Sequence, residues 1–92
     1  MYLHIGKNTT VDTEDITAVL DMDNITVAKI SRDFLKQAQR RGEVRSVAED
    51  IPKSVIVCER DGVTCVYITN ISSRAIAGRI RRLRSLEGYS VY

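Results

Sequence analysis

The sequence predicts a small α+β domain, a small antiparallel sheet of about five strands with two helices. Three observations lead to this fold class. Two β-prone runs flank an Asp61-Gly62 pair, short β-prone segments open the chain, and two later stretches repeat apolar residues at helical spacing. We expect the 92 residues to form a single domain, 1–92, that is marginally stable on its own.

The first third of the chain predicts three short strands. Residues 2–5 alternate in polarity and end at Gly6, and the β-branched residues 9–11 are expected to pair back on them. Residues 16–20 predict a third strand. The polar run 21–24 is expected to end it.

A first helix is predicted from Thr26, as its N-cap, to about Arg41, with Gly42 as its C-terminal stop. One face of this helix is cationic, and such a face is either merely solvated or a binding surface. The cationic residues are Lys29, Arg32, Lys36 and Arg40, and the apolar stripe comprises Val27, Ile30, Phe34, Leu35 and Ala38.

A central hairpin is predicted over residues 53–69, after an irregular segment with a short strand at 44–47. An Asp-Gly pair favours a two-residue turn, which fixes the register. Val57 then faces Val66, and Cys58 faces Cys65. Both faces of the ribbon are apolar, so we expect it to be covered on both sides. The cysteines are expected to pack as reduced thiols, and a cross-strand disulfide is the alternative.

A second helix is predicted over residues 73–86, with Ser72 as its cap. Gly78 inside it costs about 1 kcal/mol relative to alanine. It either lets a backbone or a phosphate approach closely or is simply tolerated. The tail, residues 87–92, is expected to fray unless it docks on another chain. The apolar stripe is Ile76, Ile80 and Leu83, and Arg74, Arg81 and Arg82 point away from it.

Several functional classes are disfavoured by the sequence. It has no apolar run of transmembrane length and no signal peptide, so we expect a cytoplasmic protein without a membrane partner. Two cysteines and one histidine do not supply the usual four zinc ligands. No phosphate-binding glycine loop, carboxylate pair or nucleophile motif is present. We therefore expect neither an enzyme nor a bound metal or cofactor.

The formal charge of +2 conceals a strong polarity along the chain. Residues 1–28 carry −4 and residues 47–70 carry −2, whereas 29–46 and 71–92 each carry +4. Clustered arginine indicates a polyanionic partner. It could equally match an acidic patch on a neighbouring subunit, and a small core favours a homo-oligomer.

Five segments spread along the chain are informative together. They are Tyr2-Leu3-His4-Ile5-Gly6, the strand from Asp15 to Asp21, Phe34-Leu35-Lys36, the run from Pro52 to Val57, and Ser72-Ser73. In their order and spacing these segments resemble the RemA/RemB family of extracellular matrix regulatory proteins. The resemblance covers nearly the whole chain, although no single motif in it is diagnostic.

The resemblance implies a transcriptional regulator of biofilm matrix genes that assembles into rings and presents arginines to double-stranded DNA. RemA-like proteins carry arginines before the third strand and before the central hairpin, where this chain has Glu14-Asp15 and Glu49-Asp50. DNA contact is therefore expected to fall on other cations: Arg40, Arg41, Arg45, Lys53, Arg74, Arg79, Arg81 and Arg82.

A second function remains open at this point. The chain could be a protein-interaction module that partners a RemA-like regulator without binding DNA directly. Its arginines would then meet acidic protein surfaces, and salt-dependent DNA binding would separate the two functions.

Overall fold

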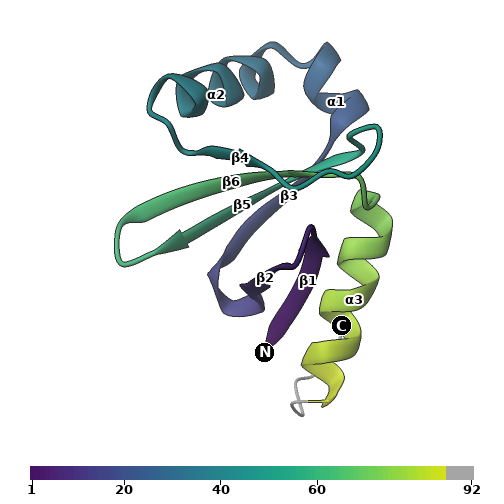
Figure 1. Cartoon of the computed structure of the whole chain (residues 1–92). Coiled ribbons are helices and arrows are strands. Elements are labelled where there is room, and N and C mark those ends of the chain that lie inside the picture. Colours follow the sequence, from purple (N-terminus) through teal and green to yellow (C-terminus); the bar gives the residue numbers. More distant parts are fainter. Residues whose placement is uncertain (87–92) are drawn as a thin grey trace.

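The computed structural model describes residues 1–86, apart from the side chains of Thr26, Val27 and Leu86. It confirms the α+β class, with six strands in two sheets and two main helices (Figure 1). The tail at 87–92 lies outside the described residues. The elements are β1 (Tyr2–Gly6), β2 (Thr9–Asp12), a 3-10 turn η1 (Thr13–Asp15), β3 (Ile16–Asp21), α1 (Met22–Val27), α2 (Lys29–Arg40), β4 (Val44–Ser46), β5 (Ser54–Arg60), β6 (Val63–Thr69) and α3 (Ser73–Leu86).

The central hairpin of β5 and β6 has the predicted register. Val57 pairs with Val66, Cys58 pairs with Cys65, and Arg60 pairs with Val63. Asp61 and Gly62 have φ angles of 52° and 79°. Both angles are positive, as a type I′ turn requires. Hairpins favour this turn because its twist matches that of the flanking strands.

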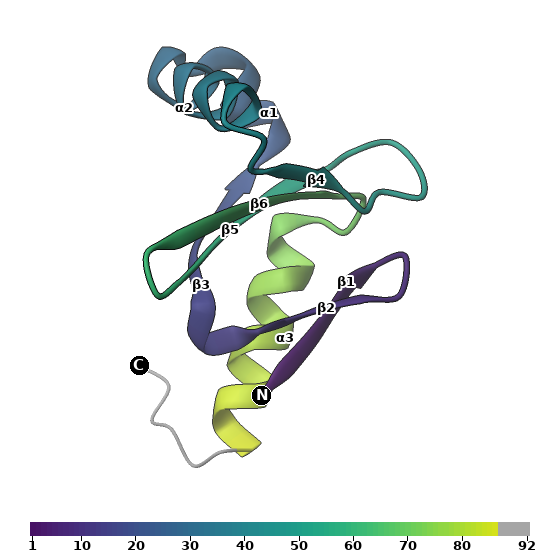
Figure 2. The ribbon, with the colours of Figure 1, turned by 60° about the vertical axis from the view of Figure 1, so that its left-hand side comes forward.

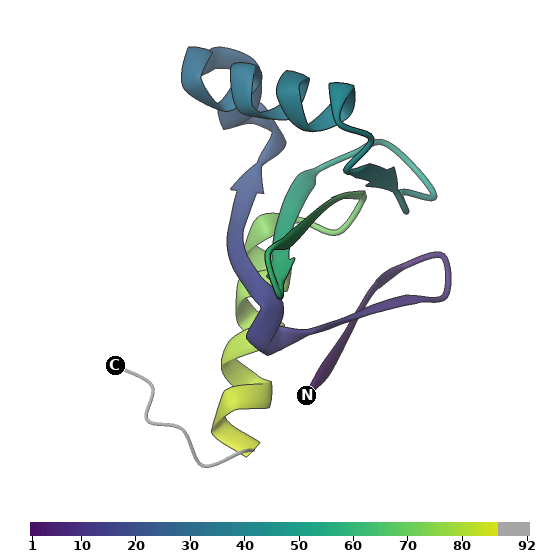
Figure 3. The same cartoon turned by 90° about the vertical axis from the view of Figure 1, so that its left-hand side faces the viewer.

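Side chains alternate along the hairpin and pack into two separate hydrophobic cores, one on each face of the sheet. Val55, Val57 and Val66 pack with Ile25 of α1 and with Ala38 of α2. On the opposite face, Ile56 and Cys58 pack with residues of β1 and β2 and with the apolar stripe of α3. Two turned views place α2 and α3 on opposite sides of the sheet (Figures 2 and 3). The prediction of a ribbon covered on both sides is confirmed.

The sheet differs from a simple antiparallel one in two respects. The strands β1 and β2 form their own two-stranded sheet, and the other four strands lie in the order β3-β5-β6-β4. In addition, β4 pairs with β6 in parallel. Since β3 and β4 sit at opposite edges and run in the same direction, their connection must cross a face of the sheet. The helices α1 and α2 make this crossover.

The prediction of one helix from Thr26 to Arg41 is wrong at its start, because Thr26 lies within α1 and a second helix, α2, begins at Lys29. Its end is confirmed, since α2 ends at Arg40 and Gly42 follows with a φ angle of 72°. The side chain of Asp21 accepts a hydrogen bond from the backbone N–H of Asp23 at 2.9 Å and so caps α1. The run 21–24 therefore begins a helix as well as ending β3. Ala28 then adopts an extended conformation, with ψ of 116°, and separates α1 from α2.

Most of the predicted apolar stripe of α2 faces the core. Phe34, Leu35 and Ala38 pack against the sheet as predicted. Ile30 does not, since 86% of its surface is exposed. Ile30 shares the helical stripe of Phe34 and Ala38, but it lies in the first turn of α2, at the end of the stripe. The side chain of Val27, also assigned to the stripe, is not described.

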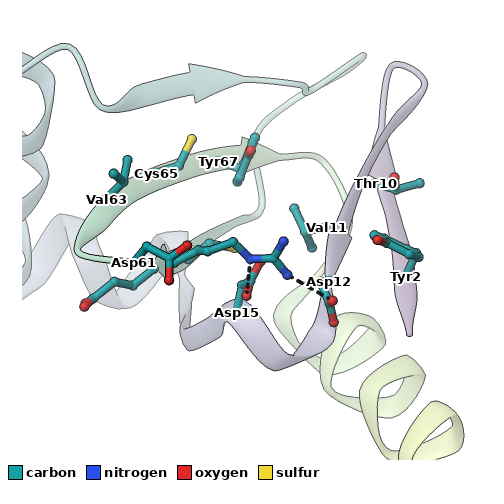
Figure 4. Close-up of a pocket in the computed structure, with 12 residues that line it drawn as sticks. Tyr2, Thr10, Val11, Asp12, Asp15, Asp61, Val63, Cys65 and Tyr67 are labelled. Carbon is teal, nitrogen blue, oxygen red and sulfur yellow. Dashed lines mark hydrogen bonds and ion pairs between the residues drawn. The ribbon is translucent and has the colours of Figure 1, made fainter.

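Three contacts between residues far apart in the sequence help to attach the N-terminal segment to the sheet. A Cβ atom at Gly6 would lie 2.3 Å from the carbonyl oxygen of Val47, so only glycine fits there. The buried hydroxyl of Thr69 donates to the carbonyl of Ile5 at 2.6 Å. The guanidinium of Arg60 contacts Asp15 at 3.0 Å and Asp12 at 3.2 Å (Figure 4).

Hydrogen bonds and neighbouring charges shift the pKa values of Asp12 and Arg60. The pKa of Asp12 is lowered, first by the hydrogen bond from the backbone of Glu14 and to a smaller extent by Arg60. The pKa of Arg60 is raised, chiefly by its hydrogen bond to Asp15. Both shifts favour the charged forms of Asp12 and Arg60, so they favour the ion pair between these two residues.

Both cysteines are free thiols on the same face of the hairpin. Cys58 is buried, and this burial raises its pKa to about 11. Cys65 is only half-buried. The side-chain hydrogen bond with Cys65, together with burial, raises the pKa of Tyr67 to about 12. The expectation that the cysteines pack as reduced residues agrees with this arrangement.

We predict that the two thiols react unequally with an alkylating reagent. The thiolate is the nucleophile, so Cys58 is protected at pH 8 by its raised pKa and its burial. Native protein treated with iodoacetamide should gain one label by mass spectrometry, and protein unfolded in guanidinium should gain two. The Cys65→Ser variant should gain none in the native state. Equal labelling rates at both sites in the native wild type would contradict this assignment.

We also predict that Val57→Asp prevents stable folding. Val57 is 8% exposed and lies opposite the fully buried Val66, so an aspartate there buries an unpaired charge. This costs several kcal/mol, which is a large part of the stability of a small domain. The control is Ser46→Asp, which places the same charge at an exposed strand position. Thermal melts should show loss of the transition only for Val57→Asp; two equal melting temperatures would show that the core assignment is wrong.

Candidate nucleic-acid interface

The helix α3 is fixed on the sheet by its cap and its apolar stripe. The hydroxyl of Ser72 accepts a hydrogen bond from the backbone N–H of Ala75 at 3.2 Å, as the sequence predicted. Ile76 is fully buried, and Ile80 and Leu83 pack against the same core. This orientation turns the opposite side of the helix toward solvent.

The outward side of α3 carries arginines and no carboxylate. Arg74, Arg81 and Arg82 are exposed, as predicted, and none of them forms an ion pair with another part of residues 1–86. The whole helix contains five arginines and no acidic residue. Clustered guanidinium groups raise the local positive potential, which attracts polyanions such as DNA.

Arg79 lies apart from the other arginines of α3. Its guanidinium donates to the backbone carbonyl of His4 at 3.3 Å, and the residue is half-buried. Arg79 therefore helps to hold α3 against β1. The position of Arg79 at the edge of the apolar stripe is visible from the helical period, but its carbonyl partner is not.

Gly78 lies beside two of the outward guanidinium groups. A Cβ atom added there would meet Arg81 Nη2 at 3.8 Å and Arg82 Nη1 at 3.9 Å, which are ordinary contact distances. No packing within the described chain therefore requires glycine at this position. The backbone at Gly78 therefore lies beside two guanidinium groups without a side chain of its own.

Four further predicted DNA-binding residues lie outside α3. Arg40 and Arg41 end α2, and the guanidinium of Arg41 pairs with Glu43 at 3.1 Å. Arg45 is exposed on β4, beside Tyr67 in the register. Lys53 is exposed immediately before β5, and its backbone bonds to Thr69.

The predicted residues therefore do not form one continuous surface. The group at the end of α2 belongs to the face of the sheet that contains Val57, whereas α3 covers the face that contains Cys58. Figure 1 shows the two helices on either side of the strands. One chain cannot present both helices to the same stretch of straight duplex, and α3 has the denser group of unpaired arginines.

Sequence reasoning left Arg84 out of the candidate residues. It is exposed in the last turn of α3, three residues after Arg81. Residues three apart lie on one side of a helix, so the helical period was the signal that could have identified it. Cations near a helix C-terminus also stabilise the helix through its dipole, which is an alternative role for this arginine.

Comparisons with protein-family models and with curated proteins find no match for this chain. Its likeness to the RemA/RemB family therefore rests on the five segments described above. Within residues 1–86, no helix is long and apolar enough to cross a membrane, and no group of three or more His, Cys, Asp or Glu side chains is arranged to hold a metal ion.

We predict that Gly78→Ala stabilises the protein by about 1 kcal/mol, the difference in helix propensity, because the added methyl group fits without a clash. If a phosphate approaches Gly78, the same variant should bind DNA more weakly. Chemical denaturation and a DNA titration measure the two effects separately. The control is Ser85→Ala at an exposed position of the same helix. Unchanged DNA affinity in Gly78→Ala would exclude phosphate contact at this glycine.

Proposed function

We propose that this protein is a DNA-binding transcriptional regulator that contacts double-stranded DNA through α3. The observation that carries the proposal is the outward row of Arg74, Arg81 and Arg82, which has neither carboxylates on the helix nor ion-pair partners within residues 1–86. Arginine forms bidentate bonds to phosphate oxygens and is therefore suited to such contacts.

Contacts of this kind provide affinity rather than sequence recognition. Phosphate contacts position a protein on the duplex, whereas base edges carry the sequence information. Because α3 is anchored by Ile76 and capped by Ser72, its arginines start from a rigid element. Rigidity lowers the entropic cost of ordering them on DNA.

The likeness to the RemA/RemB family supports the wider part of the proposal. We propose further that the protein acts in the cytoplasm on biofilm extracellular-matrix genes and that it assembles as a homo-oligomeric ring. A ring repeats the arginines of α3 once per subunit, so that several weak phosphate contacts act together.

The test is the double variant Arg81→Gln/Arg82→Gln, titrated with duplex DNA at several salt concentrations. Glutamine keeps the length of the side chain and the helix propensity but removes the charge. Each lost phosphate contact should reduce the slope of log affinity against log salt by roughly 0.9. We therefore expect weaker binding with a flatter salt dependence, and an unchanged oligomer mass.

A matched control removes two cations from elsewhere on the surface. Lys7→Gln/Lys36→Gln lowers the charge equally but changes exposed residues outside the candidate interface. It should keep the wild-type slope. Equal losses in both double variants would show that only net charge matters. Wild-type affinity and slope in Arg81→Gln/Arg82→Gln would rule out α3 as the DNA surface, and dissociation of the oligomer would place these arginines in a subunit interface.

The second candidate function is an interaction module that partners a RemA-like regulator. The separation of the cationic groups over two faces of the sheet supports it, because a protein partner can engage one face alone. Absence of salt-dependent DNA binding in the wild type, with binding to a RemA-like protein, would favour this function.

A further inference from the structure

Two thiols face each other across the central hairpin. Cys58 of β5 lies directly opposite Cys65 of β6 in the register, and both are free. Their side chains line the same cleft of about 490 Å³, which lies between the N-terminal hairpin and the central hairpin (Figure 4). Burial raises the pKa of Cys58, and a negative charge on Cys65 raises it further. The fold therefore brings together the two cysteines of the chain.

The backbone separation at this pair suits a disulfide bond. A two-residue turn makes Arg60 and Val63 a hydrogen-bonded pair, and such pairs recur at every second position, so Cys58 and Cys65 form the next one. The Cα atoms of a hydrogen-bonded pair are about 5.5 Å apart, within the range of about 4.4–6.8 Å found in disulfides. The Cβ atoms are up to about 5.5 Å apart, which exceeds the disulfide mean of about 3.8 Å. A disulfide here therefore forms with strain, and strained disulfides are easily reduced.

The two thiols differ in their access to solvent. Cys65 is half-buried, and besides the cleft it lines a second groove, beside Arg45 and Tyr67. A small oxidant can reach it from either side. Cys58 is 7% exposed, and its raised pKa keeps it protonated at neutral pH. Since peroxides react with the thiolate, Cys65 is the site of first oxidation.

We propose that Cys58 and Cys65 are a site of reversible oxidation, at which a peroxide converts the two thiols into a cross-strand disulfide. Disulfides that form inside cells are usually transient and sense oxidants, so the thiols are the resting state and the disulfide is the modified one. This inference does not depend on the proposed function, because it involves no residue of α3.

The oxidation takes place in two steps. The Cys65 thiolate attacks one oxygen of the peroxide, the O–O bond breaks, and Cys65 becomes a sulfenic acid, while the departing hydroxide takes up a proton. The sulfur of Cys58 then attacks the sulfur of Cys65, the S–O bond breaks, and hydroxide leaves with the thiol proton of Cys58 as water. The two thiols have lost two hydrogen atoms, and hydrogen peroxide has become two molecules of water. Exchange with a reduced dithiol restores both thiols.

The position of Cys58 compensates for its small thiolate fraction. A group held opposite its reaction partner reacts as if it were present at a very high concentration. The sulfenic acid on Cys65 therefore meets Cys58 before it meets a second peroxide or a thiol of another chain. The pairing across the hairpin thus directs the oxidation to one intramolecular product.

The experiment oxidises the reduced full chain with an equimolar amount of hydrogen peroxide and then labels the remaining thiols with iodoacetamide in guanidinium. Intact-mass spectrometry should show a chain that is lighter by two hydrogen atoms and carries no label. Reduction with dithiothreitol before labelling should restore both labels. Electrophoresis without reductant should show single chains, because the disulfide is intramolecular.

Two variants assign the roles of the thiols. Cys58→Ala should stop at the sulfenic acid on Cys65, which dimedone traps as a single adduct. The matched control is Cys58→Ala/Glu59→Cys, which keeps two thiols but moves one of them by one residue, to an exposed position on the other face of β5. It should form no intramolecular disulfide, and circular dichroism should show both variants folded.

Several results would overturn the inference. In the wild type these are two surviving thiols after peroxide treatment, a disulfide between two chains, or a sulfinic acid on Cys65. An intramolecular disulfide in Cys58→Ala/Glu59→Cys would also overturn it, because the bond would then not depend on the register. DNA binding by α3 is measured independently of all these results.

Discussion

The register of the β5–β6 hairpin is the constraint on which the rest of the structure depends. The turn at Asp61 and Gly62 sets this register, and a shift by one residue would exchange the two faces. Val57 and Val66 would then leave the core under α1 and α2, and Ile56 would leave the core under α3. All three helices depend on the same turn, although none of them contains any residue of it.

Burial on both faces of the hairpin has a consequence for function. It places the cationic side of α2 and the arginines of α3 on opposite sides of one thin sheet. Positive charge that appears as two clusters in the sequence is therefore not combined into one surface. Five of the acidic residues lie around the tip of the hairpin and η1, where Asp12 and Asp15 pair with Arg60.

Features set by neighbouring residues could be predicted from the sequence, and features set by distant contacts could not. The hairpin register, the cap at Ser72 and the stripe from Ile76 to Leu83 follow from local spacing and were correct. The division between α1 and α2 was missed because a single extended residue, Ala28, makes it without glycine or proline. The parallel pairing of β4 follows from the crossover of the helices, and no local pattern encodes it.

The candidate site shows the same division between local and distant information. The outward direction of Arg74, Arg81 and Arg82 follows from the helical period alone. The carbonyl partner of Arg79 lies on β1, 75 residues away in the chain, and only the fold brings the two together. The exposure of Ile30 likewise became visible only when α2 was placed on the sheet.

The charge distribution affects the orientation in which the protein would meet DNA. Carboxylates at the hairpin tip repel a polyanion, so a free copy offers DNA both an attractive and a repulsive surface. Asp12 and Asp15 are paired with Arg60, whereas Glu59 and Asp61 form no ion pair within residues 1–86. The helix α3 carries no carboxylate at all. A duplex that meets the protein is therefore attracted by α3 and repelled by the hairpin tip, and this difference favours the orientation in which α3 faces the phosphates.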